Sequence, residues 1–139
     1  DRAIRFAADA NRTGEDAYWD AVALNLHSYY SGVERIFEDI ARTIDGTLPD
    51  GADWHQRLLF QMSAEIPGIR PAVIDRDTRV SLDEYLAFRH VVRNVYAFNF
   101  RPDRLQELVN GLDKSMVAMK KGIAVFIQFL EELNKPGRG

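Results

Sequence analysis

A dense group of polar side chains lies near position 90, in the run F-R-H-V-V-R-N-V-Y-A-F-N-F-R. Arg89, Arg93 and Tyr96 are spaced i, i+4 and i+7, which places them along one edge of a helix. His90 and Asn94, also four residues apart, form a second row beside that edge. Large apolar residues fill most of the other positions, and burial alone does not explain so many polar groups in one helix.

Two guanidinium groups four residues apart repel each other unless an anion or a carboxylate lies between them. One interpretation is a phosphate site, because arginine binds phosphate through paired hydrogen bonds and stays charged at every relevant pH. A histidine or tyrosine beside the phosphate can move protons, and these parts suffice for metal-free cleavage of RNA by its own 2′-hydroxyl group. The alternative is structural: Arg89 and Arg93 form salt bridges with carboxylates of a neighbouring helix, at Glu34, Glu38 or Asp39.

Composition and motifs exclude several other kinds of site. The chain has 139 residues, a net charge of −3 and no cysteine, so disulfide bonds and thiolate chemistry are excluded. It contains no P-loop, glycine-rich dinucleotide motif, H-E-x-x-H or G-x-S-x-G. No window approaches the ~18 consecutive apolar residues of a membrane span, and the first residues lack the apolar core of a signal peptide. We therefore expect one cytoplasmic domain over residues 1–139; its start at Asp1 rather than Met is compatible with a trimmed N-terminus.

Apolar residues at three-four spacing predict the helices that position the polar group. The helices are expected at about residues 2–10, 15–44, 52–64, 82–98 and 103–134, followed by a tail at 135–139. Asp53 is the expected cap of the third helix, and Ser81 and Glu84 form a capping box before the fourth. Pro102 suits the first turn of the fifth. No strand alternation or internal repeat is visible, so the predicted fold is all-α, an antiparallel bundle of four to five helices.

The connection at residues 65–80 contains two prolines and a glycine and is expected to be non-helical. Its arginines, Arg70, Arg76 and Arg79, could add positive charge near a site. The alternative is a surface loop that is pinned by three apolar side chains, Ile69, Val73 and Ile74. His55, on an edge of the third helix, is interpreted as structural or exposed, because a single imidazole without partners is neither a metal site nor an acid–base pair.

At the polar group the chain resembles the all-helical HEPN superfamily, and within it the HepT-like toxins. That family carries a helix with the pattern Arg, four residues, His, one residue, Tyr. Arg89 and Tyr96 are in register with this pattern, and Asn94 stands where the family usually has histidine. The flanking run L-x-F-R-H-V-V-R-N-V-Y-A-F and the earlier run A-L-N-L-H-S-Y-Y-S-G-V-E-R-I-F are also similar to one HepT-like branch. The resemblance covers most of residues 15–133 and implies a HEPN-like bundle.

The resemblance also implies a function. In that family the protein is the toxin of a type II-like toxin–antitoxin pair, a homodimeric, metal-independent endoribonuclease that needs no cofactor and whose RNA substrate would be tRNA or mRNA. Its partner is a minimal nucleotidyltransferase (MNT) antitoxin, which silences the toxin by AMPylation of the motif tyrosine, here Tyr96. An AMP group there would add a bulky anion beside Arg89 and Arg93 and block substrate phosphate.

The roles that follow are implied by the resemblance. Arg89 would bind the scissile phosphate with help from Arg93, His90 and Asn94 would orient or protonate, and Tyr96 would be both phosphate neighbour and modification site, without a metal. Asparagine cannot act as a general acid or base. Either His90 supplies the imidazole, or catalysis relies on the arginines and Tyr96 with slow turnover, or the toxin is weakened.

Two other functions stay open alongside a ribonuclease. One is a non-catalytic helical interaction module that binds a nucleotidyltransferase or a nucleotide through the same arginines. The other is a structural helical protein whose arginines pair with the acidic face of the long helix.

Overall fold

The computed structural model describes residues 2–5, 16–94 and 102–135 of the chain. A helical turn at residues 2–5 comes first. The elements that follow are α2 (Asp16–Ile40), the π-helical turn η1 (Ala41–Asp45), α3 (Trp54–Met62), α4 (Arg76–Asn94) and α5 (Pro102–Leu133). Within the described residues, an isolated bridge between Ile66 and Arg70 is the only extended pairing. The predicted all-α bundle is confirmed.

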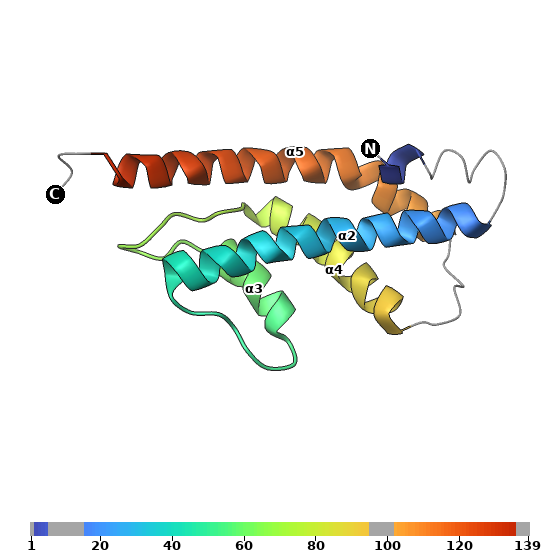
Figure 1. The fold of residues 1–139 in the computed structure, drawn as a ribbon, viewed down its shortest axis with the longest axis horizontal. Coiled ribbons are helices and arrows are strands. Elements are labelled where there is room, and N and C mark those ends of the chain that lie inside the picture. The colour runs from blue at the N-terminus through green and yellow to red at the C-terminus, as the bar shows by residue number, and fades with distance from the viewer. Residues whose placement is uncertain (1, 6–15, 95–101, 136–139) are drawn as a thin grey trace.

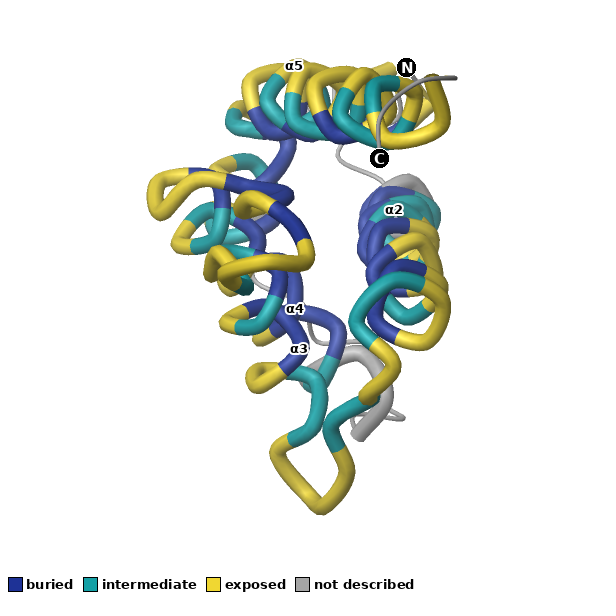
Figure 2. Tube along the Cα trace, turned by 90° about the vertical axis from the view of Figure 1, so that its left-hand side faces the viewer, coloured by how far each residue is buried: buried dark blue, intermediate teal, exposed yellow. Residues whose placement is uncertain are grey.

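The two long helices, α2 and α5, run along the length of the molecule, and the shorter helices α3 and α4 lie together on one side of it (Figure 1 and Figure 2). In Figure 1, α2 and α5 run in the same direction, while α4 runs obliquely against them. Figure 2 shows α5 across the top, α2 on one side and α3 with α4 on the other, with their buried segments turned toward the middle. None of the helices described is apolar over a length sufficient to cross a membrane. This arrangement brings side chains of α2, α3 and α4 together.

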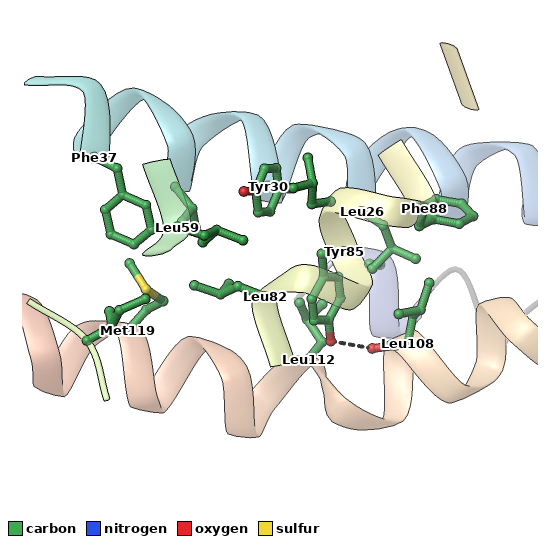
Figure 3. Close-up of a cluster of buried hydrophobic side chains, with 14 of the residues drawn as sticks. Leu26, Tyr30, Phe37, Leu59, Leu82, Tyr85, Phe88, Leu108, Leu112 and Met119 are labelled. Atoms are coloured by element: carbon green, nitrogen blue, oxygen red, sulfur yellow. Dashed lines mark hydrogen bonds between the residues drawn. The ribbon is translucent and has the colours of Figure 1, made fainter. Parts of the chain in front are cut away.

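The apolar stripes of α2, α4 and α5 meet in one core. Figure 3 shows Leu26 and Tyr30 of α2 facing Leu82 and Tyr85 of α4, with α5 beneath them. All four are almost completely buried, and each large apolar side chain removed from water contributes about 1.5–3 kcal/mol. The Tyr85 hydroxyl donates a 2.7 Å hydrogen bond to the Leu108 carbonyl, so the polar end of this core tyrosine is satisfied and links α4 to α5.

The long helix predicted for residues 15–44 is α2 continued by η1. It ends at Gly46, whose φ of 73° is the left-handed conformation that glycine adopts without strain. Asp45, the last residue of η1, pairs with Arg70 through contacts of 2.6 and 2.8 Å, and both side chains are fully buried. Burial alone would raise the pKa of the Asp45 carboxyl, but hydrogen bonds from Arg70 and Gln61 lower it. Asp45 therefore stays ionised.

The connection at residues 65–80 is pinned to the bundle, as one of its two interpretations expects. Val73 and Ile74 are buried, and their backbone N–H groups donate to the Met62 carbonyl at 2.9 and 3.2 Å. Ile69 differs from that expectation, since 44% of it is exposed. Arg70 is engaged by Asp45, so its guanidinium is not available as a charge at a substrate site.

The start of α4 corrects the predicted capping box. The helix begins at Arg76, and Ser81 lies inside it. The cap is Asp75, whose Oδ1 accepts a 2.7 Å hydrogen bond from the Thr78 backbone N–H, and hydrogen bonds with the Thr78 side chain and backbone lower the pKa of Asp75. This bond satisfies a donor that the first turn of a helix leaves unpaired. Asp53 precedes α3, but its side chain makes no capping hydrogen bond.

At the other end of α4 the described helix reaches Asn94. The predicted end at Phe98 lies outside the described residues. The fifth helix starts at Pro102, as predicted.

Candidate active site

Arg89 lies on the buried face of α4, one turn after Tyr85, and its guanidinium meets a carboxylate of α2. Arg89 Nη1 donates to Glu34 Oε1 at 2.8 Å. Only 5% of the Arg89 side chain and 8% of the Glu34 side chain are exposed. A charge this deeply buried is tolerated only with an opposite charge beside it. The packing of α4 against α2 therefore fixes the pair.

His55, at the start of α3, completes the cluster. Its Nδ1 lies 2.7 Å from Glu34 Oε2 and 2.8 Å from Arg89 Nη2, while its Nε2 lies 3.4 Å from the same Nη2. Glu34 thus uses one carboxylate oxygen for the guanidinium and the other for the imidazole. We call Glu34, His55 and Arg89 the buried triad.

One tautomer of His55 serves both neighbours. The ionised carboxylate of Glu34 can only accept, so the 2.7 Å contact requires a hydrogen on Nδ1. The neutral ring then carries its lone pair on Nε2, which accepts from Arg89 Nη2 at 3.4 Å. With this tautomer the short distance between Nδ1 and Nη2 is a contact and not a hydrogen bond.

Aromatic rings enclose the triad. The rings of Trp54 and His55 lie 3.8 Å apart between centroids, tilted by 30°, and His90 of α4 meets His55 edge-to-face at 5.5 Å. The Arg89 guanidinium carbon lies 5.2 Å from the centroid of the Tyr30 ring. Burial raises the pKa of Tyr30, and the charge of Glu34 raises it further, so Tyr30 is a neutral phenol. Two imidazoles and one guanidinium therefore occupy a single, largely apolar site.

The guanidinium of Arg89 is not fully used. Its Nε has no hydrogen-bond partner among the described residues, although the atom is buried. Leaving a buried donor unpaired costs on the order of 1–3 kcal/mol. This N–H group, together with the long contact to His55, keeps hydrogen-bonding capacity beyond the pair with Glu34.

The predicted site residues fall into three groups. Arg89 and His90 are in the cluster. Arg93 and Asn94 belong to the last turn of α4, and their side chains lie outside what the structure describes. Tyr96 lies outside the described residues altogether. The structure therefore places Arg89 and His90 in one cluster, and the roles of Arg93, Asn94 and Tyr96 stay predictions.

His55 is the residue that sequence patterns missed. It is interpreted from the sequence as structural or exposed because no partner is visible there; the structure gives it two charged partners, which lie 21 and 34 positions away. No local signal indicates such contacts, because periodicity places a side chain on a face of its own helix and says nothing about the helix opposite. Glu34 was among the carboxylates that the structural alternative named as partners of Arg89.

A hollow between α2 and α5 offers little chemistry. It is lined mainly by apolar side chains, including Ile36, Met116, Ile123 and Ile127, with Lys120 among them. A lone lysine on an apolar surface neither clamps phosphate in the bidentate manner of arginine nor pairs with an acid or base there. The triad is the better candidate for a reaction.

Comparisons with known proteins assign the chain to a family. Searches of curated proteins and of solved structures found no match to the chain. A family model described as HepT-like protein matches residues 21–130, a span that includes all three members of the triad. Such a match suggests the HEPN-type toxin superfamily, in which nucleases are general. Because the matched span is well over half of the chain, this protein belongs to the HepT-like family.

Proposed function

We propose that this protein is the toxin of a toxin–antitoxin pair and cleaves RNA without a metal ion. The observation that carries the proposal is the triad, which sets a guanidinium and an imidazole side by side in a HepT-like chain. Cleavage of RNA by its own 2′-hydroxyl needs a group that stabilises charge on phosphate and groups that move protons. The triad and His90 supply both kinds of group within a few ångströms.

In this proposal Arg89 and Arg93 bind the scissile phosphate, and His90 and Asn94 orient or protonate it. Arg89 is only 4% exposed, so a phosphate oxygen reaches it only when a neighbouring side chain turns aside. The unpaired Nε–H and the weakly used Nη2–H then supply donors while Glu34 keeps Nη1. Phosphate binding thus adds to the buried ion pair and does not replace it.

The proposal includes the partners that the family resemblance implies. The active form is a homodimer in the cytoplasm, and its RNA substrate is tRNA or mRNA. A nucleotidyltransferase antitoxin of the MNT type neutralises it by transferring AMP to Tyr96. The added phosphate brings negative charge next to the arginines of the motif helix, where it competes electrostatically with RNA.

The test is cleavage of total tRNA or mRNA by the purified protein in EDTA. We expect cleavage by the wild type and a loss of about 10²–10³-fold in Arg93→Ala, since removing one stabilising donor of a transition state typically costs that much. Arg89→Ala is expected to lose at least as much. Because it also uncovers Glu34, its fold is checked by circular dichroism. Arg57→Ala, at an exposed arginine of α3, is the matched control and should cleave normally. A wild type that is inactive at every concentration contradicts the proposal.

The modification is tested separately by mass spectrometry. After incubation with the antitoxin and ATP, we expect an AMP adduct on Tyr96, loss of RNA cleavage, and no adduct on Tyr96→Phe. An adduct on a different residue would overturn the assignment of Tyr96 and leave the ribonuclease proposal standing.

A second candidate function is a non-catalytic module that binds the nucleotidyltransferase. The deep burial of the Arg89–Glu34 pair favours it, because a guanidinium paired inside the core is a structural element as much as a catalytic one. Tight antitoxin binding by a wild type that cleaves no RNA would decide for the module.

A further inference from the structure

We infer that His55 is a catalytic residue of this ribonuclease and supplies the imidazole that position 94 lacks. The inference rests on the proposed function and extends it to a residue of another helix, α3. It starts from a contact. His55 reaches the guanidinium of the motif arginine, with its Nδ1 2.8 Å from Arg89 Nη2.

The first step of the argument is how His55 is held. A carboxylate that accepts from one ring nitrogen fixes the tautomer and the orientation of the ring, and it stabilises the imidazolium formed when the other nitrogen takes a proton. Glu34 Oε2 does this at 2.7 Å from Nδ1. Nε2 is therefore the nitrogen that can serve a substrate, because its contact with Arg89 is a long one of 3.4 Å.

The second step is access. In the triad, His55 has the most exposed side chain, at 13%, compared with 8% for Glu34 and 5% for Arg89. The imidazole is therefore the group of the triad that solvent reaches most readily, and with it a substrate.

The third step is the second imidazole. His90 lies edge-to-face to His55, with ring centroids 5.5 Å apart and planes at 79°. Transfer of a phosphoryl group between two oxygens of RNA needs a base for the oxygen that attacks and an acid for the oxygen that leaves. Two imidazoles at this separation, from different helices, can serve these two positions.

The reaction is balanced without any further reactant. Nε2 of neutral His55 takes the proton of the ribose 2′-hydroxyl, and the 2′-oxygen forms a bond to phosphorus. The bond between phosphorus and the 5′-oxygen breaks, and His90 in its protonated form gives that oxygen a proton. The products are a 2′,3′-cyclic phosphate and a 5′-hydroxyl end; proton exchange with water then restores both histidines.

The test is the cleavage rate of His55→Asn and His55→Ala, with His27→Asn as the matched control at the remaining histidine of the chain. General acid–base catalysis contributes typically 10²–10⁴-fold, so we expect a loss in that range for both His55 variants and none for the control. In His55→Asn, the acid limb of the pH–rate profile should also disappear, because an amide does not titrate.

Chemical rescue separates catalysis from a structural role. Added imidazole should restore a measurable part of the activity of His55→Ala, whereas pyrazole, of the same shape but far less basic, should not. Rescue by both compounds, or by neither while the wild type is active, overturns the inference, as does full activity with an unchanged pH profile in His55→Asn. In each of these results, activity of the wild type and its loss in Arg93→Ala still support the ribonuclease. An inactive wild type removes the ribonuclease and this inference together.

Discussion

Arg89 carries a full positive charge to a place where 5% of its side chain meets solvent. Such a charge is stable only because the carboxylate of Glu34 lies beside it. Removing one partner of a buried ion pair destabilises a protein strongly, whereas the intact pair adds little stability compared with apolar residues in its place. Folding and the proposed function therefore depend on the same contact at this residue. A loss of activity in any variant of the triad must be compared with its stability.

The first prediction concerns Glu34→Gln. The amide keeps the size of the side chain and can still contact His55, but it leaves the guanidinium buried without a countercharge. We expect the free energy of unfolding to fall by about 3 kcal/mol, measured by urea denaturation at pH 7.

The control for this prediction is Glu38→Gln on the same helix. Glu38 meets Arg42 at 3.8 Å, and 58% of the Arg42 side chain is exposed. Exposed pairs of this kind contribute less than about 1 kcal/mol. Equal stability of Glu34→Gln and Glu38→Gln would show that the triad does not hold the fold.

His55 changes the meaning of Asn94. An asparagine in the motif is an obstacle to proton transfer only if the motif helix has to provide every imidazole. In the fold, α3 provides one from the opposite side, next to the motif arginine. The departure at position 94 is therefore compatible with the proposed ribonuclease.

At the scale of the elements, α4 is longer than its sequence pattern indicates. It gains the turn Arg76–Val80, because Asp75 provides a cap and charged residues tolerate a helix whose first turn faces solvent. The sequence pattern assigns the polar residues of that turn to the non-helical connection, and the structure corrects this. The extra turn also places Arg79 over the ring of Phe60, with its guanidinium carbon 4.0 Å from the centroid, and so ties α4 to α3.

The second prediction tests this cap. Asp75→Ala should lower the free energy of unfolding by about 1 kcal/mol, as the loss of a capping side chain does. Hydrogen bonds hold the pKa of Asp75 below its ordinary value of 3.8. The contribution of the ionised cap is therefore present above about pH 4 and is lost as the pH falls through the lowered pKa.

The matched variant is Ser81→Ala, at the position that the capping box proposed. Ser81 is internal to α4, so this change should stay within about 0.5 kcal/mol of wild type. The free energy of unfolding of both variants is measured by thermal or urea denaturation. A larger loss of stability in Ser81→Ala than in Asp75→Ala would show that Ser81, and not Asp75, caps the helix.

At the scale of the whole molecule, α5 is held against the rest by contacts along its length. Near the start of α5, the Tyr85 hydroxyl donates a hydrogen bond to the Leu108 carbonyl. Farther along, Gly122 lies against the connection before α4: a Cβ atom at this glycine would be 2.8 Å from the Val73 carbonyl oxygen. That distance allows hydrogen only, so the absence of a side chain sets how closely α5 approaches the connection.

The third prediction is that Gly122→Ala is destabilising although alanine favours helix. The new methyl group would overlap the carbonyl oxygen of Val73. This part of the backbone is held in place, because the Val73 N–H donates a hydrogen bond to the Met62 carbonyl. Overpacking of this kind costs about 1–3 kcal/mol, which exceeds the gain of ~1 kcal/mol in helix propensity. Denaturant unfolding should show a net loss of stability.

Gly111→Ala is the comparison on the same helix. Its Cβ atom would meet only the Tyr85 hydroxyl oxygen, at 3.5 Å, which is an ordinary contact. We expect this variant to be as stable as wild type or more stable. The opposite order of the two glycine variants would contradict the close approach at residue 122.

The sequence by itself was sufficient for the helices and for the family. Three-four periodicity is a property of each helix alone, so α2, α3 and α5 could be placed within a few residues. The run around Arg89 was enough to single out the motif and its register. The start of α4 failed because two caps compete within six residues, and only the observed hydrogen bond between Asp75 and Thr78 distinguishes them.

Only the tertiary structure decided which groups surround the motif arginine. Glu34, His55 and Arg89 belong to three helices and are separated by 21 and 34 residues along the chain, and their meeting depends on how α2, α3 and α4 cross. Periodicity shows which face of a helix is buried, but not which helix packs against that face. Burial then strengthens the attraction between charged residues that are far apart in the sequence. For the same reason His55, a lone histidine in the sequence, is a member of the site in the fold.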